Sequence, residues 1–126
     1  MSQTHQGGCF CGRHRYTFDD GDYVTANCHC SMCRRISGAP YVSWVVVPKS
    51  RFRFEGPEPK RLRSSEGGTR LFCSNCGTPL ACELDKQPED IDITIGTLDE
   101  PERWPPRYEV HDDTKLAWLG TTLSET

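Results

Sequence analysis

Hydrophobic and polar residues alternate in short runs along this chain, which is the pattern of β-strands with one buried face. The run YVSWVVV at residues 41–47 predicts the clearest strand, because it is rich in β-branched residues and stops at Pro48. Similar runs predict strands at residues 13–18, 22–28, 51–56, 60–66, 69–73, 78–84 and 90–96. The expected fold class is therefore mainly β, with little helix.

Turn residues refine this pattern. Gly67 and Gly68 separate two of the predicted strands, which indicates a hairpin. The segment SMCRRISG at residues 31–38 favours one or two helical turns, with Ser31 as the candidate N-cap and Gly38 as the stop.

The C-terminal segment, residues 101–120, is rich in Pro and Trp. We expect it to wrap over the sheet, with Trp104 and Trp118 as anchors. Trp44 and Tyr41 are expected in the core.

Composition changes the picture of how the fold is stabilised. The 126 residues suit a single domain over residues 1–126 with one core. Only 35% of the residues are hydrophobic, while eight are cysteines. A small core with many cysteines predicts stabilisation by cross-links, either metal sites or disulfides.

Charge excludes some classes of function. The net charge is −3 and the basic residues are scattered in short pairs, which argues against a nucleic-acid-binding face. No apolar run approaches the ~20 residues of a membrane span, and the polar N-terminus predicts no secretory signal. We therefore expect a soluble, cytoplasmic protein, in which thiols act as metal ligands or reactive groups before they form disulfides.

Two cysteine pairs have the spacing of metal-binding turns. A glycine follows each pair and suits the left-handed residue of such a turn. Together the pairs would form a closed four-cysteine site, which is typical of structural zinc. The alternative is a pair of disulfides. The residues are Cys9, Cys11, Cys73 and Cys76, with Gly12 and Gly77.

A third group, Cys28, Cys30 and Cys33, offers three sulfurs within one short segment. Three protein ligands and one open position describe a catalytic zinc, which lowers the pKa of a water or thiol bound there. Two alternatives remain open: Cys82 or a histidine closes the site, or the three thiols are unmetallated redox groups. Cys82 itself lies in an apolar run and could simply be a small buried hydrophobe.

The cysteine framework resembles a known family. Four stretches in this order are similar to the glutathione-dependent formaldehyde-activating enzymes, a family that also includes centromere protein V. They are GGCFCG (residues 7–12), NCHCSMCRRISGAPYVSW (27–44), FCSNCGTPLAC (72–82) and PPRYEVHDDTKLAWLG (105–120).

This resemblance implies a β-tent of antiparallel sheets pinned by zinc knuckles, and two zinc ions per chain. It implies a structural zinc on Cys9, Cys11, Cys73 and Cys76, and a catalytic zinc on Cys28, Cys30 and Cys33. The implied reaction adds glutathione to formaldehyde, or reverses that addition as a carbon–sulfur lyase. The alternative function is a non-catalytic zinc module that docks a protein partner or handles metal.

Several other side chains are weaker candidates. Arg34 and Arg35 could contact the carboxylates of glutathione, or merely offset the negative charge of the thiolates. His29 lies between two cysteines on a strand, so its side chain should point away from theirs. His111 in the tail is a candidate proton carrier.

Overall fold

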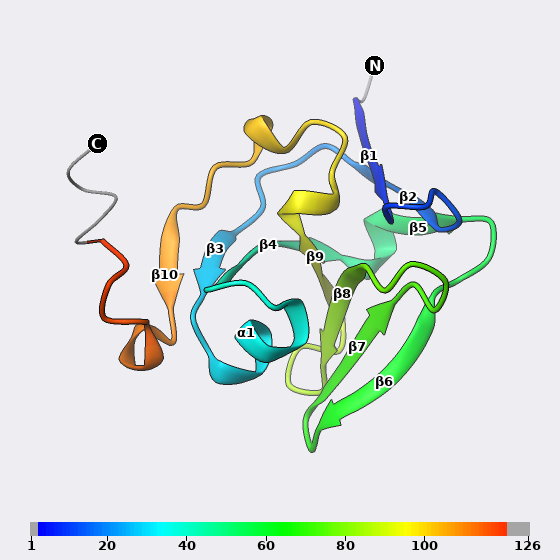
Figure 1. Ribbon diagram of the computed structural model, residues 1–126. Coiled ribbons are helices and arrows are strands. Elements are labelled where there is room, and N and C mark those ends of the chain that lie inside the picture. Colours follow the sequence, from blue (N-terminus) through cyan, green and yellow to red (C-terminus); the bar gives the residue numbers. More distant parts are fainter. Residues whose placement is uncertain (1–2, 121–126) are drawn as a thin grey trace.

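The structure, a computed structural model, describes residues 3–120, and β-strands dominate it (Figure 1). The strands are β1 Thr4–Gly8, β2 Arg15–Asp19, β3 Thr25–Cys28, β4 Val42–Pro48, β5 Phe52–Glu55, β6 Lys60–Ser65, β7 Gly68–Phe72, β8 Pro79–Leu84, β9 Asp90–Thr94 and β10 Tyr108–Val110. The one α-helix of these residues is α1, Ser31–Ser37, and the 3-10 helices are η1 Lys49–Arg51, η2 Ile95–Thr97, η3 Pro101–Arg103 and η4 Asp112–Thr114. The predicted mainly β class is confirmed.

The strands form two sheets. A three-stranded sheet has the order β1-β2-β5, and a seven-stranded sheet has the order β10-β3-β4-β9-β8-β7-β6. Neighbouring strands are antiparallel except β10, which pairs in parallel with β3. The predicted hairpin of β6 and β7 is confirmed.

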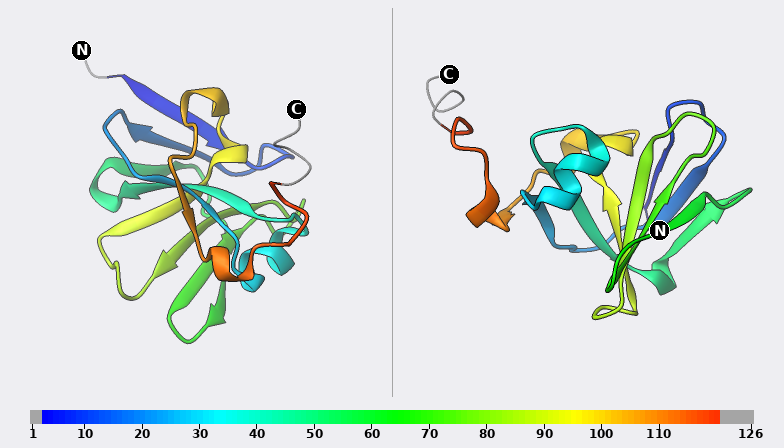
Figure 2. Two further views of the ribbon diagram at one scale, coloured as in Figure 1. Left: turned by 90° about the vertical axis from the view of Figure 1, so that its left-hand side faces the viewer. Right: turned by 60° about the horizontal axis from the view of Figure 1, so that its bottom comes forward.

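The large sheet is covered on both faces, because α1 and the small sheet lie on opposite sides of it (Figures 1 and 2). Side chains alternate between the faces along each strand, so directly paired residues share a face. Val45, Ile93 and Ala81 are paired across three strands and face the small sheet. Arg70, Cys82 and Asp92 are paired in the same way and share the other face, with α1.

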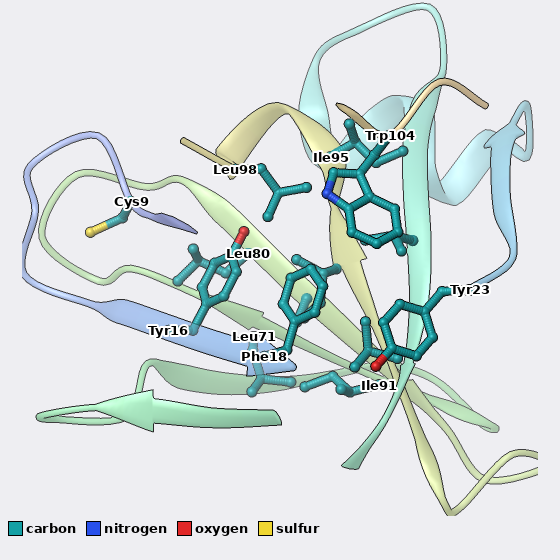
Figure 3. Close-up of a cluster of buried hydrophobic side chains, with 14 of the residues drawn as sticks. Cys9, Tyr16, Phe18, Tyr23, Leu71, Leu80, Ile91, Ile95, Leu98 and Trp104 are labelled. Atoms are coloured by element: carbon teal, nitrogen blue, oxygen red, sulfur yellow. The ribbon is translucent and has the colours of Figure 1, made fainter. Parts of the chain in front are cut away.

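The main core lies between the two sheets (Figure 3). Tyr16 and Phe18 of β2 are almost fully buried there, and Trp104 and Tyr23 close one end. Burying each side chain of this size stabilises the fold by about 1.5–3 kcal/mol. This core holds the cysteine-bearing loop after β1 against the large sheet, because Cys9 is part of the same cluster.

Strand β1 was not predicted from the hydrophobic pattern. Its buried positions are His5 and Gly7, which no hydropathy pattern marks as core residues. Gly7 is required there because a Cβ would lie 2.3 Å from the Tyr16 hydroxyl oxygen. The strand exists because it pairs along its whole length with β2.

Helix α1 begins one residue earlier than expected. Its N-cap is Cys30 rather than Ser31, and the Cys30 sulfur accepts a hydrogen bond from the backbone N–H of Cys33 at 3.2 Å. Gly38 ends the helix, as predicted, and it does so in the left-handed conformation. The short helix thereby buries Cys33 against the large sheet.

The C-terminal segment wraps around the edge of the large sheet through β10 (Figure 1). Trp104 is buried as predicted, but Trp118 is 54% exposed, so it is not the buried anchor that we expected. Tyr41 is only half-buried, whereas Trp44 is buried. No helix within residues 3–120 is long and apolar enough to cross a membrane.

Candidate metal centres

The structure brings seven of the eight cysteines into two groups, each of which could hold a metal ion. We call Cys9, Cys11, Cys73 and Cys76 the knuckle cluster, and Cys28, Cys30 and Cys33 the triplet cluster. Within each group the sulfur atoms lie within 4.8 Å of one another.

The knuckle cluster is built by two tight turns. The backbone N–H of Gly12 donates to the Cys9 carbonyl oxygen, and that of Gly77 donates to the Cys73 carbonyl oxygen. Both glycines have positive φ angles, 81° and 85°, which residues with a Cβ rarely adopt. The glycines expected to shape these turns therefore do so.

The spacing of the sulfurs fits a tetrahedral ion. Four sulfurs placed 2.3 Å from a central zinc would lie about 3.8 Å apart. The Cys9 and Cys11 sulfurs are 3.6 Å apart, and those of Cys11 and Cys73 are 3.7 Å apart. A set of four soft sulfur donors at this spacing suits zinc.

Thr78 joins the two turns of the knuckle cluster, which sequence reasoning missed. Its hydroxyl oxygen accepts a hydrogen bond from the Phe10 backbone N–H and lies 3.1 Å from the Cys76 sulfur. Hydrogen bonds from the side chain and backbone of Thr78 lower the pKa of Cys76 to about 5. This favours the thiolate, the form of cysteine that binds metal.

The triplet cluster lies on the other face of the large sheet, under α1. Cys28 ends β3, Cys30 caps α1, and Cys33 comes from the first turn of the helix. The Cys28 and Cys33 sulfurs are 3.5 Å apart, again close to the spacing around a zinc ion. Within residues 3–120 no fourth thiol joins this group.

Arg70 on β7 is the main charged neighbour of the triplet cluster. It is only 7% exposed, and its Nη1 lies 3.5 Å from the Cys33 sulfur. Its Nε donates to the Ser64 hydroxyl, and its guanidinium lies over the Trp44 ring at 5.8 Å. No ion pair joins Arg70 to a carboxylate in the part of the chain that the structure describes.

The environment of Arg70 has an electrostatic consequence. Hydrogen bonds with Cys28, Cys30 and Arg70 lower the pKa of Cys33 to about 5, although burial opposes this. Burial alone would lower the pKa of Arg70, but the Cys33 sulfur raises it. A buried cation is costly unless it is paired, and the Cys33 sulfur, whose lowered pKa favours the thiolate, is the group that this guanidinium contacts.

Cys82 lies beside the triplet cluster without joining its group of sulfurs. It packs with Cys28, Cys33 and Trp44 and is 5% exposed, and burial raises the pKa of its thiol to about 11. Its cross-strand neighbour Asp92 has a carboxyl whose pKa burial raises to about 6. These features fit a protonated, packed thiol better than a metal ligand.

The other candidates lie around the triplet cluster. His29 is 2% exposed and its Nε2 lies 2.6 Å from the Glu109 carboxylate on β10, so it faces the tail, while its Nδ1 has no partner among the described residues. His111 is exposed on the tail. Arg34 and Arg35 lie in the last turn of α1 and line an open depression of about 450 Å³ together with Leu116.

Comparisons with known proteins agree with this architecture. The chain is similar to the crystal structure of a Rhodobacter sphaeroides protein, with a TM-score of 0.68 and 19% sequence identity. The similarity covers 83% of this chain and 99% of the other, and at this identity it supports the fold alone. No curated protein matches the chain.

The sequence model of one family, the glutathione-dependent formaldehyde-activating enzymes, matches residues 4–114. The match includes both cysteine clusters, Arg70 and the strand β10. The resemblance noted from the cysteine motifs is thus confirmed, and this chain belongs to the glutathione-dependent formaldehyde-activating enzyme family.

Proposed function

We propose that this protein is a zinc-dependent enzyme of the carbon–sulfur lyase class. It would join a small thiol such as glutathione to an aldehyde such as formaldehyde, or separate the two. Family membership supports a glutathione- and formaldehyde-related function. The observation that carries the proposal is a group of three cysteine sulfurs next to a buried guanidinium that pairs with no carboxylate of residues 3–120.

In this proposal the two clusters hold two zinc ions. The knuckle cluster would hold a structural zinc, because four protein sulfurs complete its coordination. Cys28, Cys30 and Cys33 would hold a catalytic zinc, which supplies an open position where the pKa of a bound thiol falls. The cytoplasm, which the sequence favours, would keep all eight thiols reduced.

Arg70 would stabilise the charge that develops in the reaction. As the carbon–sulfur bond forms, an electron pair of the thiolate moves to the carbonyl carbon, and the C=O pair moves onto oxygen. The resulting alkoxide then takes up a proton, equal to the one that the thiol released, so the addition needs no oxidant or reductant. A fixed positive charge close to the cluster lowers the energy of that alkoxide.

Arg34 and Arg35 would receive the carboxylates of the thiol. Both lie at the C-terminal end of α1, on the depression that Leu116 also lines. A guanidinium can bind a carboxylate through two parallel hydrogen bonds. The depression begins one helical turn after Cys30, so a glutathione-sized molecule bound there would have its charged end near the cluster.

Replacing Cys30 by serine tests this proposal. Serine is a good N-cap, so Cys30→Ser should keep α1 while removing one sulfur from the triplet cluster. We expect zinc content to fall from about two to about one per chain. We also expect the catalysed addition of glutathione to formaldehyde to fall more than about 100-fold, measured after subtracting the enzyme-free rate.

Ser31→Ala is the matched control, because Ser31 is the exposed neighbour of Cys30 and not a member of the cluster. It should retain both metal content and activity. Catalysis that survives Cys30→Ser would remove the triplet cluster from the mechanism. A parent protein that binds two zinc ions but accelerates no such addition would favour the non-catalytic zinc module instead.

A further inference from the structure

A groove next to the triplet cluster is the feature that the proposed function does not use. It has a volume of about 190 Å³ and lies between α1 and the strands β6 to β8. Five of its lining residues are apolar: Ile36, Leu62, Leu71, Phe72 and Pro79. Leu62 and Ile36 remain 47% and 37% exposed, so the groove is open to solvent.

Arg70 connects this groove to the triplet cluster. Among the residues that the structure describes it is the only charged one in the lining, and the same guanidinium contacts the Cys33 sulfur through Nη1. Its Nη2 has no hydrogen-bond partner within the described residues. Ile36 follows Cys33 by three positions on α1, so these two side chains lie on the same side of the helix.

The groove differs from the depression lined by Arg34 and Arg35. Successive residues of a helix are about 100° apart, so Ile36 projects from a different side of α1 than either arginine. One side of the helix is therefore suited to anionic groups and the other to an apolar group. Two substrates that meet at the triplet cluster can occupy the two sides.

We propose that the groove binds the carbon chain of the aldehyde, and that the natural aldehyde carries an apolar chain of about three to six carbons. This inference rests on the proposed function. Arg70 lines the groove itself. An aldehyde whose oxygen contacts Arg70 can therefore extend its carbon chain into the groove. At about 30 Å³ per water-sized group the groove has room for about six such groups, whereas formaldehyde has no chain to place there.

Straight-chain carboxylates test the groove without turnover. Acetate, butyrate and hexanoate each carry a negative oxygen next to an alkyl chain. The alkoxide that forms when a thiolate adds to an aldehyde carries the same two features. Calorimetry on the zinc-loaded full chain should show affinity rising about two- to fourfold for each added methylene. The rise should persist in Cys30→Ser, since the chain and not the triplet metal produces it.

Two variants make the test specific. Leu62→Asn should remove most of the dependence on chain length, while Leu84→Asn should retain it. Leu84 is a matched control because it is 37% exposed and lies on β8 outside the groove. Both positions are exposed enough for the variants to fold, which circular dichroism would verify.

Equal affinities for acetate and hexanoate would overturn the inference, as would a chain-length dependence that Leu62→Asn leaves intact. Rates with formaldehyde, butanal and hexanal separate this outcome from the proposed function. If formaldehyde is turned over but the carboxylates show no dependence on chain length, the groove inference fails and the lyase proposal stands. If the carboxylates bind as expected but no aldehyde reacts, the groove stands and the lyase proposal fails.

Discussion

The two cysteine clusters use the same ligand atom but differ in how the chain reaches it. The knuckle cluster joins two loops, and the contacting sulfurs of Cys11 and Cys73 are 62 positions apart in sequence. The triplet cluster draws its sulfurs from one segment, and those of Cys28 and Cys33 are five positions apart. A metal that closes a long loop removes more entropy from the unfolded chain, so a metal in the knuckle cluster would contribute more to folding than one in the triplet cluster.

The clusters also differ in their neighbours. Backbone N–H groups of His14 and Cys76 donate to sulfurs of the knuckle cluster, and Thr78 completes these uncharged contacts. The triplet cluster instead adjoins the buried guanidinium of Arg70 and lies close to the half-buried carboxyl of Asp92. Burying charged groups costs stability, so their presence beside the triplet cluster agrees with the proposal that chemistry takes place there and that the knuckle cluster is a scaffold.

The largest expected effect is on the knuckle cluster. Cys76→Ser should cost more than about 5 kcal/mol and abolish cooperative unfolding near room temperature, because metal binding at a closed site contributes directly to folding. Thermal unfolding followed by circular dichroism, together with zinc content, measures this. Cys30→Ser in the triplet cluster should leave most of the transition intact.

Ser74→Ala serves as the control in the same turn, since Ser74 is exposed and outside the cluster. It should unfold like the parent protein. An unchanged melting curve for Cys76→Ser would show that the knuckle cluster does not stabilise the fold, and the contrast between the clusters would disappear.

A smaller effect is expected from Arg70→Met. Removing a charge-assisted hydrogen bond worth about 1.5–3 kcal/mol should raise the pKa of Cys33 by about one to two units. Protons compete with metal for thiolates, so acid should release the triplet metal at a pH about one unit higher than in the parent. Zinc release into a coloured chelator, measured across pH, follows this change.

Arg70→Lys should recover part of the shift, because it restores the charge but not the planar fork. Arg63→Met is the control, since Arg63 is exposed on the neighbouring strand and pairs with Asp85. If Arg70→Met and Arg63→Met move the metal-release curve equally, the effect comes from net charge, and Arg70 has no special relation to Cys33.

The importance of Arg70 could not be predicted from its local sequence. The stretch TRLFC correctly predicts a strand, and the spacing of the cysteines correctly separates a group of four from a group of three. The roles of the two groups as structural and catalytic zinc sites stay predictions. Arg70 reaches Cys33 only because β7 pairs with β8 in a register that sets it opposite Cys82. Short periodic segments show which residues share a face, but not which strands become neighbours.

The same limit explains the other misses. Strand β10 is recognisable only through its parallel pairing with β3. More than half of the chain separates these two strands, so no local pattern indicates that they pair. Cys30 was recognised as a candidate ligand, yet its second role as the N-cap of α1 depends on the backbone geometry that the cluster itself requires. A sequence rule that recognises one role of a residue, such as metal ligand, does not reveal a second role, such as N-cap.

The smallest expected effect concerns Asp92, the half-buried carboxyl near the triplet cluster. Burial raises its pKa to about 6 from an ordinary value of 3.8. Between these values the folded chain holds a proton that the unfolded chain has released, so this group lowers stability as pH rises through 6. Asp92→Asn cannot ionise and should therefore be more stable than the parent at pH 8, by about 1–3 kcal/mol.

Denaturant titrations at pH 8 and pH 5 measure this gain in the free energy of unfolding, which should be smaller at pH 5. Asp113→Asn on the exposed tail is the control and should show no such dependence on pH. A gain of equal size at both pH values would mean that ionising Asp92 costs the folded chain no stability. The face that carries the triplet cluster would then tolerate ionised groups as well as the knuckle side does.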